Sequence, residues 1–282
     1  MIYKKYGETF RQMRIQAEFS LSSFSVIGIP KSTLSNFELG YSMMSFDKVV
    51  LALQLIGSSL SDFENNLNNY GLSDSDALAE EILYAYIRDD TTSLKDLKEI
   101  TKISEYSYLE ICIKVILNEA TQDEIETVVD FLYKIHIWSY KELFILYIML
   151  DDIKWKDILN ILRNLKSTGQ ELYNSDMYKG YLAHVLYRAV TSLCLKGDKI
   201  RSQSILNSIV YYDLANTMTL QNLLKAINGF WLYCFEDKKL GKQMILEFLD
   251  IQHLVGQDDF SKYYNKRFFY LIDQIDNQVE EQ

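Results

Sequence analysis

Apolar side chains recur along most of this chain at spacings of three, four and seven positions, the period of an amphipathic α-helix. Near the start, Phe10, Met13 and Ala17 form such a stripe. The segments 108–116 and 223–235 carry the same pattern, and short polar breaks separate one apolar segment from the next. The pattern predicts an all-α protein.

The composition excludes several other classes of protein. The 282 residues include one proline and 11 glycines, the residues on which tight hairpin turns depend, so a sandwich, barrel or propeller is not expected. The longest apolar stretch, 143–150, is far shorter than the roughly 18–20 residues that cross a bilayer, and the first residues lack the apolar core of a signal peptide. Three widely spaced cysteines predict neither a disulfide framework nor a zinc site. We expect a cytoplasmic protein.

Charge is divided unevenly along the chain. The net charge is −10, but residues 1–60 hold six basic and four acidic side chains, a balance of +2. The remaining residues hold 23 basic and 35 acidic side chains. Because local rather than total charge decides whether a surface binds phosphates, the acidic average does not exclude a nucleic-acid ligand for the first 60 residues.

Five short helices are predicted within residues 1–66. The first spans about 6–17, the second spans 21–27 between Ser20 and Gly28, and the third spans 31–39 between Pro30 and Gly40. The fourth opens at Ser45 or Asp47 and the fifth at Ser59 or Ser61. Leu34 and Phe37 should face the core while the polar side of the third helix faces solvent. A helix, a short turn with glycine and a second helix of this kind predict a helix-turn-helix.

The segment Ile29–Gly40, Ile-Pro-Lys-Ser-Thr-Leu-Ser-Asn-Phe-Glu-Leu-Gly, resembles the recognition-helix region of Xre/Cro-like repressors. It is more similar still to the Rgg/RopB/MutR transcriptional regulators of Gram-positive bacteria, which carry Lys-Ser-x-Leu-Ser-x-Phe-Glu-x-Gly. Those regulators also open with Tyr-Gly-x-x-x-Arg-x-x-Arg, which this chain has at Tyr6–Arg14. The resemblance therefore implies a DNA-binding regulator with an N-terminal helix-turn-helix domain, residues 1–66.

The resemblance implies a set of residues that face promoter double-stranded DNA: Arg11, Arg14, Lys31, Ser32, Thr33, Ser35 and Asn36. For Arg14 a second role stays open, an ion pair with Glu38 that ties the first helix to the third. The chain departs from many relatives by having Asn36 and Leu39 in place of arginine, so its third helix is less basic. A domain of balance +2 would bind DNA weakly alone, so we expect a homodimer that doubles the contacts.

Residues 67–73 are expected to be a linker, and residues 74–282 to form a TPR-like helical repeat domain of about ten helices arranged as a superhelix. An Ala-x-x-x-aromatic spacing recurs at Ala183/Tyr187 and Ala226/Phe230, although periodicity alone indicates only a helical repeat. The resemblance implies that this domain dimerises and binds a short signalling peptide on its concave surface, as in quorum sensing.

Candidate peptide-binding residues lie on the helices expected to line that surface: Arg88, Tyr147, Tyr181, His184, Arg188, Asn222 and Trp231. Their polar groups suit a peptide carboxylate or backbone, while core packing is the alternative for the aromatic ones. The acidic composition of the repeat domain favours a peptide with some positive charge, while a groove whose local charge differs from that of the whole domain is left open as the alternative.

Catalytic motifs are absent from the sequence. It has no His-Glu-x-x-His, no Walker-type Gly-Lys-Ser/Thr, no Gly-x-Gly-x-x-Gly after a strand and no Gly-x-Ser-x-Gly. His136, His184 and His253 are isolated, and the pairs Asp151–Asp152 and Asp258–Asp259 are interpreted as helix caps and dipole partners. Cys112, Cys194 and Cys234 fall on apolar stripes and are expected to be buried. No enzyme activity, cofactor or metal is expected.

Two other hypotheses remain open. The chain could be a helical-repeat scaffold for protein–protein interaction without DNA binding, with its N-terminal domain as a dimer module. A helical enzyme has less support, because it would need a pocket of perturbed titratable groups that a sequence does not reveal.

Overall fold

The computed structural model describes residues 2–69, 71, 73–103, 106–255 and 258–280. Every regular element in these ranges is a helix, which confirms the predicted all-α class. The chain divides into two compact units, Met1–Ala77 and Leu78–Gln282, which we call the head and the body. The expected linker, 67–73, contains residues 70 and 72, which lie outside the described residues.

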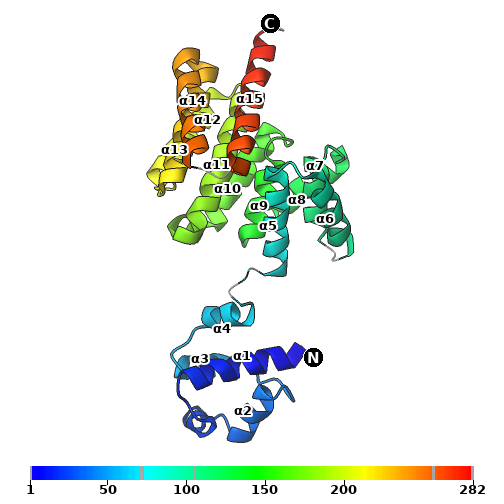
Figure 1. Ribbon diagram of the computed structural model, residues 1–282, viewed down its shortest axis with the longest axis vertical. Coiled ribbons are helices and arrows are strands. Elements are labelled where there is room, and N and C mark those ends of the chain that lie inside the picture. The colour runs from blue at the N-terminus through cyan, green and yellow to red at the C-terminus, as the bar shows by residue number, and fades with distance from the viewer. Residues whose placement is uncertain (1, 70, 72, 104–105, 256–257, 281–282) are drawn as a thin grey trace. The chain divides into compact units, whose positions relative to one another are not determined.

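The head contains α1 (Ile2–Gln16), the 3₁₀-helix η1 (Leu21–Ile27), α2 (Lys31–Glu38), α3 (Phe46–Leu55) and α4 (Leu60–Leu67) (Figure 1). Ser45 is the N-cap of α3, and Ser59 forms a capping box with Asp62 at α4. The second element is a 3₁₀-helix rather than the expected α-helix. The Ser20 hydroxyl lies 2.8 Å from the hydroxyls of Ser22 and Ser23, and Gly28 ends the element in the left-handed conformation.

The head core forms where α1, η1 and α2 meet. Phe10, Phe24, Leu34 and Phe37 are almost completely buried, as expected for the last two. Gly7 lets α1 approach α2 closely, since a β-carbon at this position would lie 1.9 Å from the carbonyl oxygen of Phe37. The glycine of the Tyr-Gly motif therefore has a packing role.

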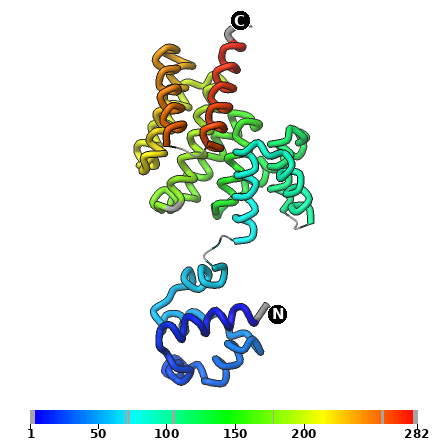
Figure 2. The backbone as a smooth tube through the Cα atoms, viewed as in Figure 1, coloured from blue at the N-terminus to red at the C-terminus, as the bar shows by residue number. Residues whose placement is uncertain are grey.

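The body begins within α5 and continues to the C-terminal helix. Its helices are α5 (Asp74–Ile87), α6 (Thr91–Ile103), α7 (Ser107–Ile116), α8 (Gln122–Tyr133), α9 (Tyr140–Met149), α10 (Trp155–Thr168), the 3₁₀-helix η2 (Gln170–Asn174), α11 (Asp176–Leu195), α12 (Lys199–Tyr211), α13 (Met218–Phe235), α14 (Lys238–Val255) and α15 (Asp258–Glu280). Helices adjacent in sequence pack in pairs, α6 with α7, α11 with α12 and α13 with α14, and Figure 2 shows these hairpins following one another through the body. This arrangement is a helical repeat.

Helix α11 runs through the centre of the body. It packs against α9, α12, α13 and α15. Ala183 and Ala226, the small residues of the recurring Ala-x-x-x-aromatic spacing, are fully buried on α11 and α13. None of the helices in the described ranges combines the length and apolar character that crossing a lipid bilayer requires.

Candidate functional site

Helix α2 presents one polar side to solvent. Its opposite side, with Leu34 and Phe37, fills the head core. The five residues of α2 expected to contact DNA divide by exposure: Lys31, Ser32 and Asn36 are exposed, and Thr33 and Ser35 are half-buried. Short polar side chains on the outer face of the second element of a helix-turn-helix are suited to the edges of bases in a major groove.

Arg11 and Arg14 lie on different sides of α1. Arg11 is exposed, whereas Arg14 is only 8% exposed. Arg14 donates from Nε to Glu38 Oε1 at 2.6 Å and from Nη2 to Oε2 at 2.8 Å, and its Nη1 donates to the carbonyl of Phe19 at 2.7 Å. These bonds to Glu38 raise the pKa of Arg14. Of the two roles open for Arg14, the structure shows the ion pair, and its inclusion among the DNA contacts is corrected because its nitrogens bond within the head.

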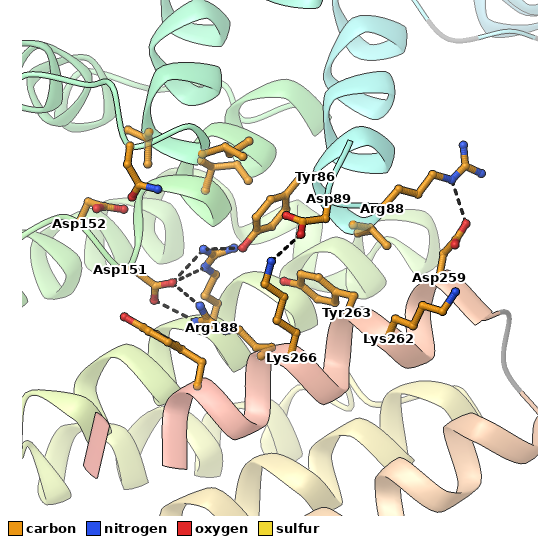
Figure 3. Close-up of a pocket in the computed structure, with 17 residues that line it drawn as sticks. Tyr86, Arg88, Asp89, Asp151, Asp152, Arg188, Asp259, Lys262, Tyr263 and Lys266 are labelled. Atoms are coloured by element: carbon orange, nitrogen blue, oxygen red, sulfur yellow. Dashed lines mark hydrogen bonds and ion pairs between the residues drawn. The ribbon is translucent and has the colours of Figure 1, made fainter. Parts of the chain in front are cut away.

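The body contains a cavity of about 550 Å³. The ends of α5, α7 and α9 form one side and α15 forms the other, with α11 beneath. Figure 3 shows Lys262, Tyr263 and Lys266 of α15 lying opposite Tyr86 of α5 and Arg88 in the turn that follows it. Segments far apart in the sequence thus enclose one space.

The wall of this cavity is rich in charge. Among the described residues it holds five basic side chains, Arg88, Arg188, Lys262, Lys266 and Arg267, and four acidic ones, Asp89, Asp151, Asp152 and Asp259. Two exposed ion pairs join the turn after α5 to α15, with Arg88 Nε 3.0 Å from Asp259 Oδ2 and Lys266 Nζ 2.7 Å from Asp89 Oδ2. The local balance is positive in a body that is acidic overall, so the expectation of a cationic peptide does not match the lining.

Asp151 is the centre of a cluster with two arginines, in which Arg188 is buried and Asp151 and Arg267 are half-buried. Arg188 donates to Asp151 Oδ2 from Nε at 3.1 Å and from Nη2 at 2.8 Å, and Arg267 donates to Oδ2 at 2.6 Å and to Oδ1 at 3.1 Å. Burial acts to raise the pKa of Asp151, but the two guanidinium groups outweigh it and hold the pKa well below its usual range. The carboxylate is therefore charged, and two cations share it.

The same cluster corrects one interpretation made from the sequence. Asp151 was expected to cap a helix, but the N-cap of α10 is Lys154, and Asp151 binds arginines of α11 and α15 instead. Burial, followed by the neighbouring Asp151, raises the pKa of Asp152. Asp258 and Asp259 do lie in the first turn of α15, where negative charge is favourable.

An aromatic cavity of about 240 Å³ adjoins the charged one. Tyr147, Tyr181 and His184 are in its wall together with Tyr263, which also lines the larger cavity. The hydroxyls of Tyr147 and Tyr263 lie 2.8 Å apart, and the guanidinium carbon of Arg188 lies 4.5 Å from the centre of the Tyr147 ring. Burial lowers the pKa of His184 to about 4, so this side chain is neutral near pH 7.

The structure gathers five of the seven candidate peptide-binding residues. Arg88 and Arg188 line the charged cavity, and Tyr147, Tyr181 and His184 line the aromatic one. Asn222 and Trp231 line neither, because both belong to α13 on the far side of α11 from α9. The Trp231 indole is 7% exposed and donates to the Ser202 hydroxyl at 3.1 Å, which is a core role.

Sequence reasoning missed Tyr86, Asp151, Tyr263, Lys266 and Arg267 as members of this site. One signal was present, because residues 262–267 read Lys-Tyr-Tyr-Asn-Lys-Arg, a basic and aromatic run within an acidic domain. Among the described residues, no group of three or more His, Cys, Asp or Glu side chains is arranged to hold a metal ion.

No family model matches the chain. Solved structures with a similar fold include the SHP pheromone receptor Rgg2 of Streptococcus dysgalactiae, with a TM-score of 0.72 and 17% identity over 94% of this chain and 99% of that chain. PrgX in complex with cCF10 has a TM-score of 0.63 and 13% identity over 94% and 99%. PlcR of Bacillus thuringiensis, in complex with the peptide PapR7 and DNA, has a TM-score of 0.63 and 13% identity over 95% and 99%. At these identities the likeness establishes the fold, a helix-turn-helix domain followed by a TPR-like helical domain.

Proposed function

We propose that this chain is a cytoplasmic transcriptional regulator of the Rgg type whose DNA binding is controlled by a short signalling peptide. The observation that carries the proposal is the end-to-end likeness to PlcR, a protein solved with both a peptide and DNA, over 95% of this chain. Two features of this chain support the proposal, a solvent-facing polar side on α2 and an open cavity in the body. A fold shared at low identity is a guide to function only when the sites suit the chemistry, and both sites do.

Promoter DNA is the proposed ligand of the head. Lys31, Ser32 and Asn36 are exposed on α2, with Thr33 and Ser35 beside them, and Arg11 is exposed on α1. Serine, threonine and asparagine hydroxyls and amides suit base edges, while lysine and arginine suit phosphates. With so few cations in the head, one copy would bind weakly, and a homodimer with two heads is proposed to reach useful affinity.

The signalling peptide is proposed to occupy the charged and aromatic cavities of the body. The two cavities adjoin each other, with volumes of about 550 and 240 Å³, and together they offer room for a few residues of an extended peptide. Arg88 and Arg188 offer donors for peptide carbonyl or carboxylate oxygens, and Tyr147, Tyr181 and His184 offer aromatic surface. Asn222 and Trp231 are left out of this proposal, since neither lines these two cavities.

A protein–protein scaffold is the second candidate, and one observation favours it. Val26, Tyr41 and Phe46 of the head are 80%, 77% and 70% exposed. Exposed apolar side chains that lie together are a feature of surfaces that contact a second protein. DNA binding by the head would distinguish the two candidates, because only phosphate contacts make affinity fall steeply with salt.

The proposed function is tested by titrating labelled promoter fragments from the source genome with the full-length chain, with and without short peptides secreted by the source cells. We expect the chain to bind a subset of fragments and at least one peptide to change that affinity by about fivefold or more, as expected for coupled sites. DNA binding that no peptide alters would contradict peptide control.

A further inference from the structure

We propose that the cluster of Asp151, Arg188 and Arg267 is a subsite that binds a carboxylate of the peptide. The cluster has two positive charges and one negative charge, and the peptide carboxylate supplies the second negative charge. The inference rests on the proposed function and specifies the ligand chemistry of that site. It states that a peptide carboxylate joins the two guanidinium groups beside Asp151, while an adjacent apolar side chain of the peptide enters the aromatic cavity.

Charge balance is the first argument. Two guanidinium groups share one carboxylate, at donor–acceptor distances of 2.6–3.1 Å. Within the cavity wall the other close ion pairs, Arg88–Asp259 and Lys266–Asp89, are each one cation to one anion. Buried charge is costly unless paired, so a second carboxylate would be strongly favourable at this point and much less so at the others.

An unsatisfied donor is the second argument. Arg188 is 92% buried, since its exposed fraction is 8%, and its Nη1 has no hydrogen-bond partner among the described residues. Its Nε and Nη2 both donate to Asp151, and Nη2 also lies 3.4 Å from the Tyr86 hydroxyl. Arginine presents donors on two edges, and Asp151 occupies only one of them. A buried donor without a partner costs free energy that a ligand oxygen would recover.

The aromatic cavity beside Arg188 indicates which kind of peptide side chain lies next to the carboxylate. Arg188 lies over the Tyr147 ring, whose hydroxyl bonds to that of Tyr263, so this tyrosine pair stands between the charged cavity and the aromatic one. The aromatic wall continues with Phe144 and Tyr181. A ligand that places its carboxylate on Arg188 therefore has an apolar space next to it, which favours an apolar side chain adjoining the carboxylate.

The first test separates a ligand-binding role of Arg188 from a structural one. Replacing Arg188 by methionine leaves Arg267 and Asp151 as a matched pair, whereas Asp151→Asn leaves the buried Arg188 and the half-buried Arg267 without an anion. In the ligand-free full-length chain, we expect R188M to melt at or above the wild-type temperature and D151N to melt well below it. Equal losses in both variants would show that Arg188 serves the fold alone, and would overturn the proposal.

The second test identifies the ligand group. Three pools of synthetic hexapeptides are equilibrated with the full-length chain, and bound peptides are recovered by gel filtration and counted by mass spectrometry. One pool has free C-termini and no acidic residues, one is amidated and has none, and one is amidated but contains a single Asp or Glu. Retention from the first pool indicates a terminal carboxylate, and retention from the third indicates a side-chain carboxylate.

We expect retention from a carboxylate-bearing pool and a loss of about tenfold or more in R188M, the size typical of a charged hydrogen bond. Arg163→Met is the matched control, because Arg163 is exposed and its Nη1 bonds to Asn160 outside the cavity wall. Equal retention of the amidated, acid-free pool would overturn the carboxylate subsite while leaving peptide binding intact. No retention from any pool would contradict peptide binding itself.

Discussion

Arg14 of α1 donates hydrogen bonds to both carboxylate oxygens of Glu38 on α2, from Nε to Oε1 at 2.6 Å and from Nη2 to Oε2 at 2.8 Å. Its neighbour in the motif, Arg11, lies in solvent. Of these two arginines, Arg14 joins α1 to α2 inside the head, and Arg11 is the one that we propose to contact DNA.

Substituting these two arginines should therefore have different consequences. Arg11→Ala should abolish promoter binding without changing head stability, because its side chain is exposed. Arg14→Ala leaves Glu38 buried without a partner and should destabilise the head by about 3–5 kcal/mol. Far-UV circular dichroism measures stability, and a gel-shift titration measures DNA affinity. Unchanged DNA affinity in Arg11→Ala would refute the assignment of this surface.

Gly7→Ala should loosen the head alone. The added methyl group would lie 1.9 Å from the Phe37 carbonyl oxygen, so α1 must move away from α2, at a cost of roughly 1–3 kcal/mol. All three tryptophans, Trp138, Trp155 and Trp231, belong to the body. We expect an earlier transition by far-UV circular dichroism while the tryptophan fluorescence transition stays in place.

Gly180→Ala is the matched control for this substitution. Gly180 lies within α11, and a β-carbon there would have open space around it. Alanine is the better helix former, so this variant should be neutral or more stable by about 0.5–1 kcal/mol. If Gly7→Ala behaves in the same way, the close approach of α1 and α2 does not exist as described.

Lowering the pH should reduce the stability of the body, because His184 takes up a proton more readily when the chain is unfolded. Its folded pKa is about 4, against 6.5 for the ordinary side chain, so the unfolded chain binds a proton that the folded chain excludes. Stability is then fully present above pH 6.5 and falls as the pH drops toward 4. At pH 5 the loss relative to pH 7 should be about 2 kcal/mol.

Denaturant unfolding followed by tryptophan fluorescence at pH 7 and pH 5 measures this loss. In His184→Gln the part of the pH dependence due to this residue should disappear. His136→Gln should keep the full dependence, because His136 is exposed. A His184→Gln variant with the wild-type pH dependence would show that folding does not lower the pKa of this imidazole.

The three cysteines should differ in reactivity. Burial raises the pKa of the Cys112 thiol, and burial together with contact to Cys234 raises that of Cys194, so neither forms the reactive thiolate. Cys234 is only half-buried. Iodoacetamide at pH 8 should modify Cys234 first in the native chain, and the other two only after unfolding. Early labelling of Cys112 or Cys194 in the native chain would reopen a redox role.

Features set by residues close together in the sequence were predicted better than contacts between residues far apart in the sequence. The ends of the second and third head helices were predicted because Gly28 and Gly40 adopt the positive φ that favours glycine, and Ser45 is the N-cap of α3 as one of the two residues expected. The first helix begins at Ile2, earlier than the predicted residue 6. The 3₁₀ form of η1 was not predicted, because the choice between two helical forms depends on small differences in local hydrogen bonding.

The body cavity was predicted only in part. Periodicity placed Tyr147, His184 and Arg188 on helices, but not which of their neighbours would be charged. Asp151 bonds to Arg188 and Arg267, which are 37 and 116 positions away in the sequence, and no local sequence pattern predicts such contacts. Trp231, in contrast, was included among the candidates although it lies in the core. An aromatic side chain on a helical stripe gives the same sequence pattern whether it lines a groove or fills the core.

The salt dependence of DNA affinity tests the central claim most directly. Fluorescence anisotropy should be measured between 50 and 200 mM salt with the wild type, Lys31→Ala, and Lys239→Ala as a control that removes an exposed lysine of the body. We predict a steep linear fall of log affinity with log salt, a slope smaller by about 1 in Lys31→Ala, and no change in Lys239→Ala. An affinity independent of salt and equal in all three proteins would contradict a DNA-binding regulator and favour the protein–protein scaffold.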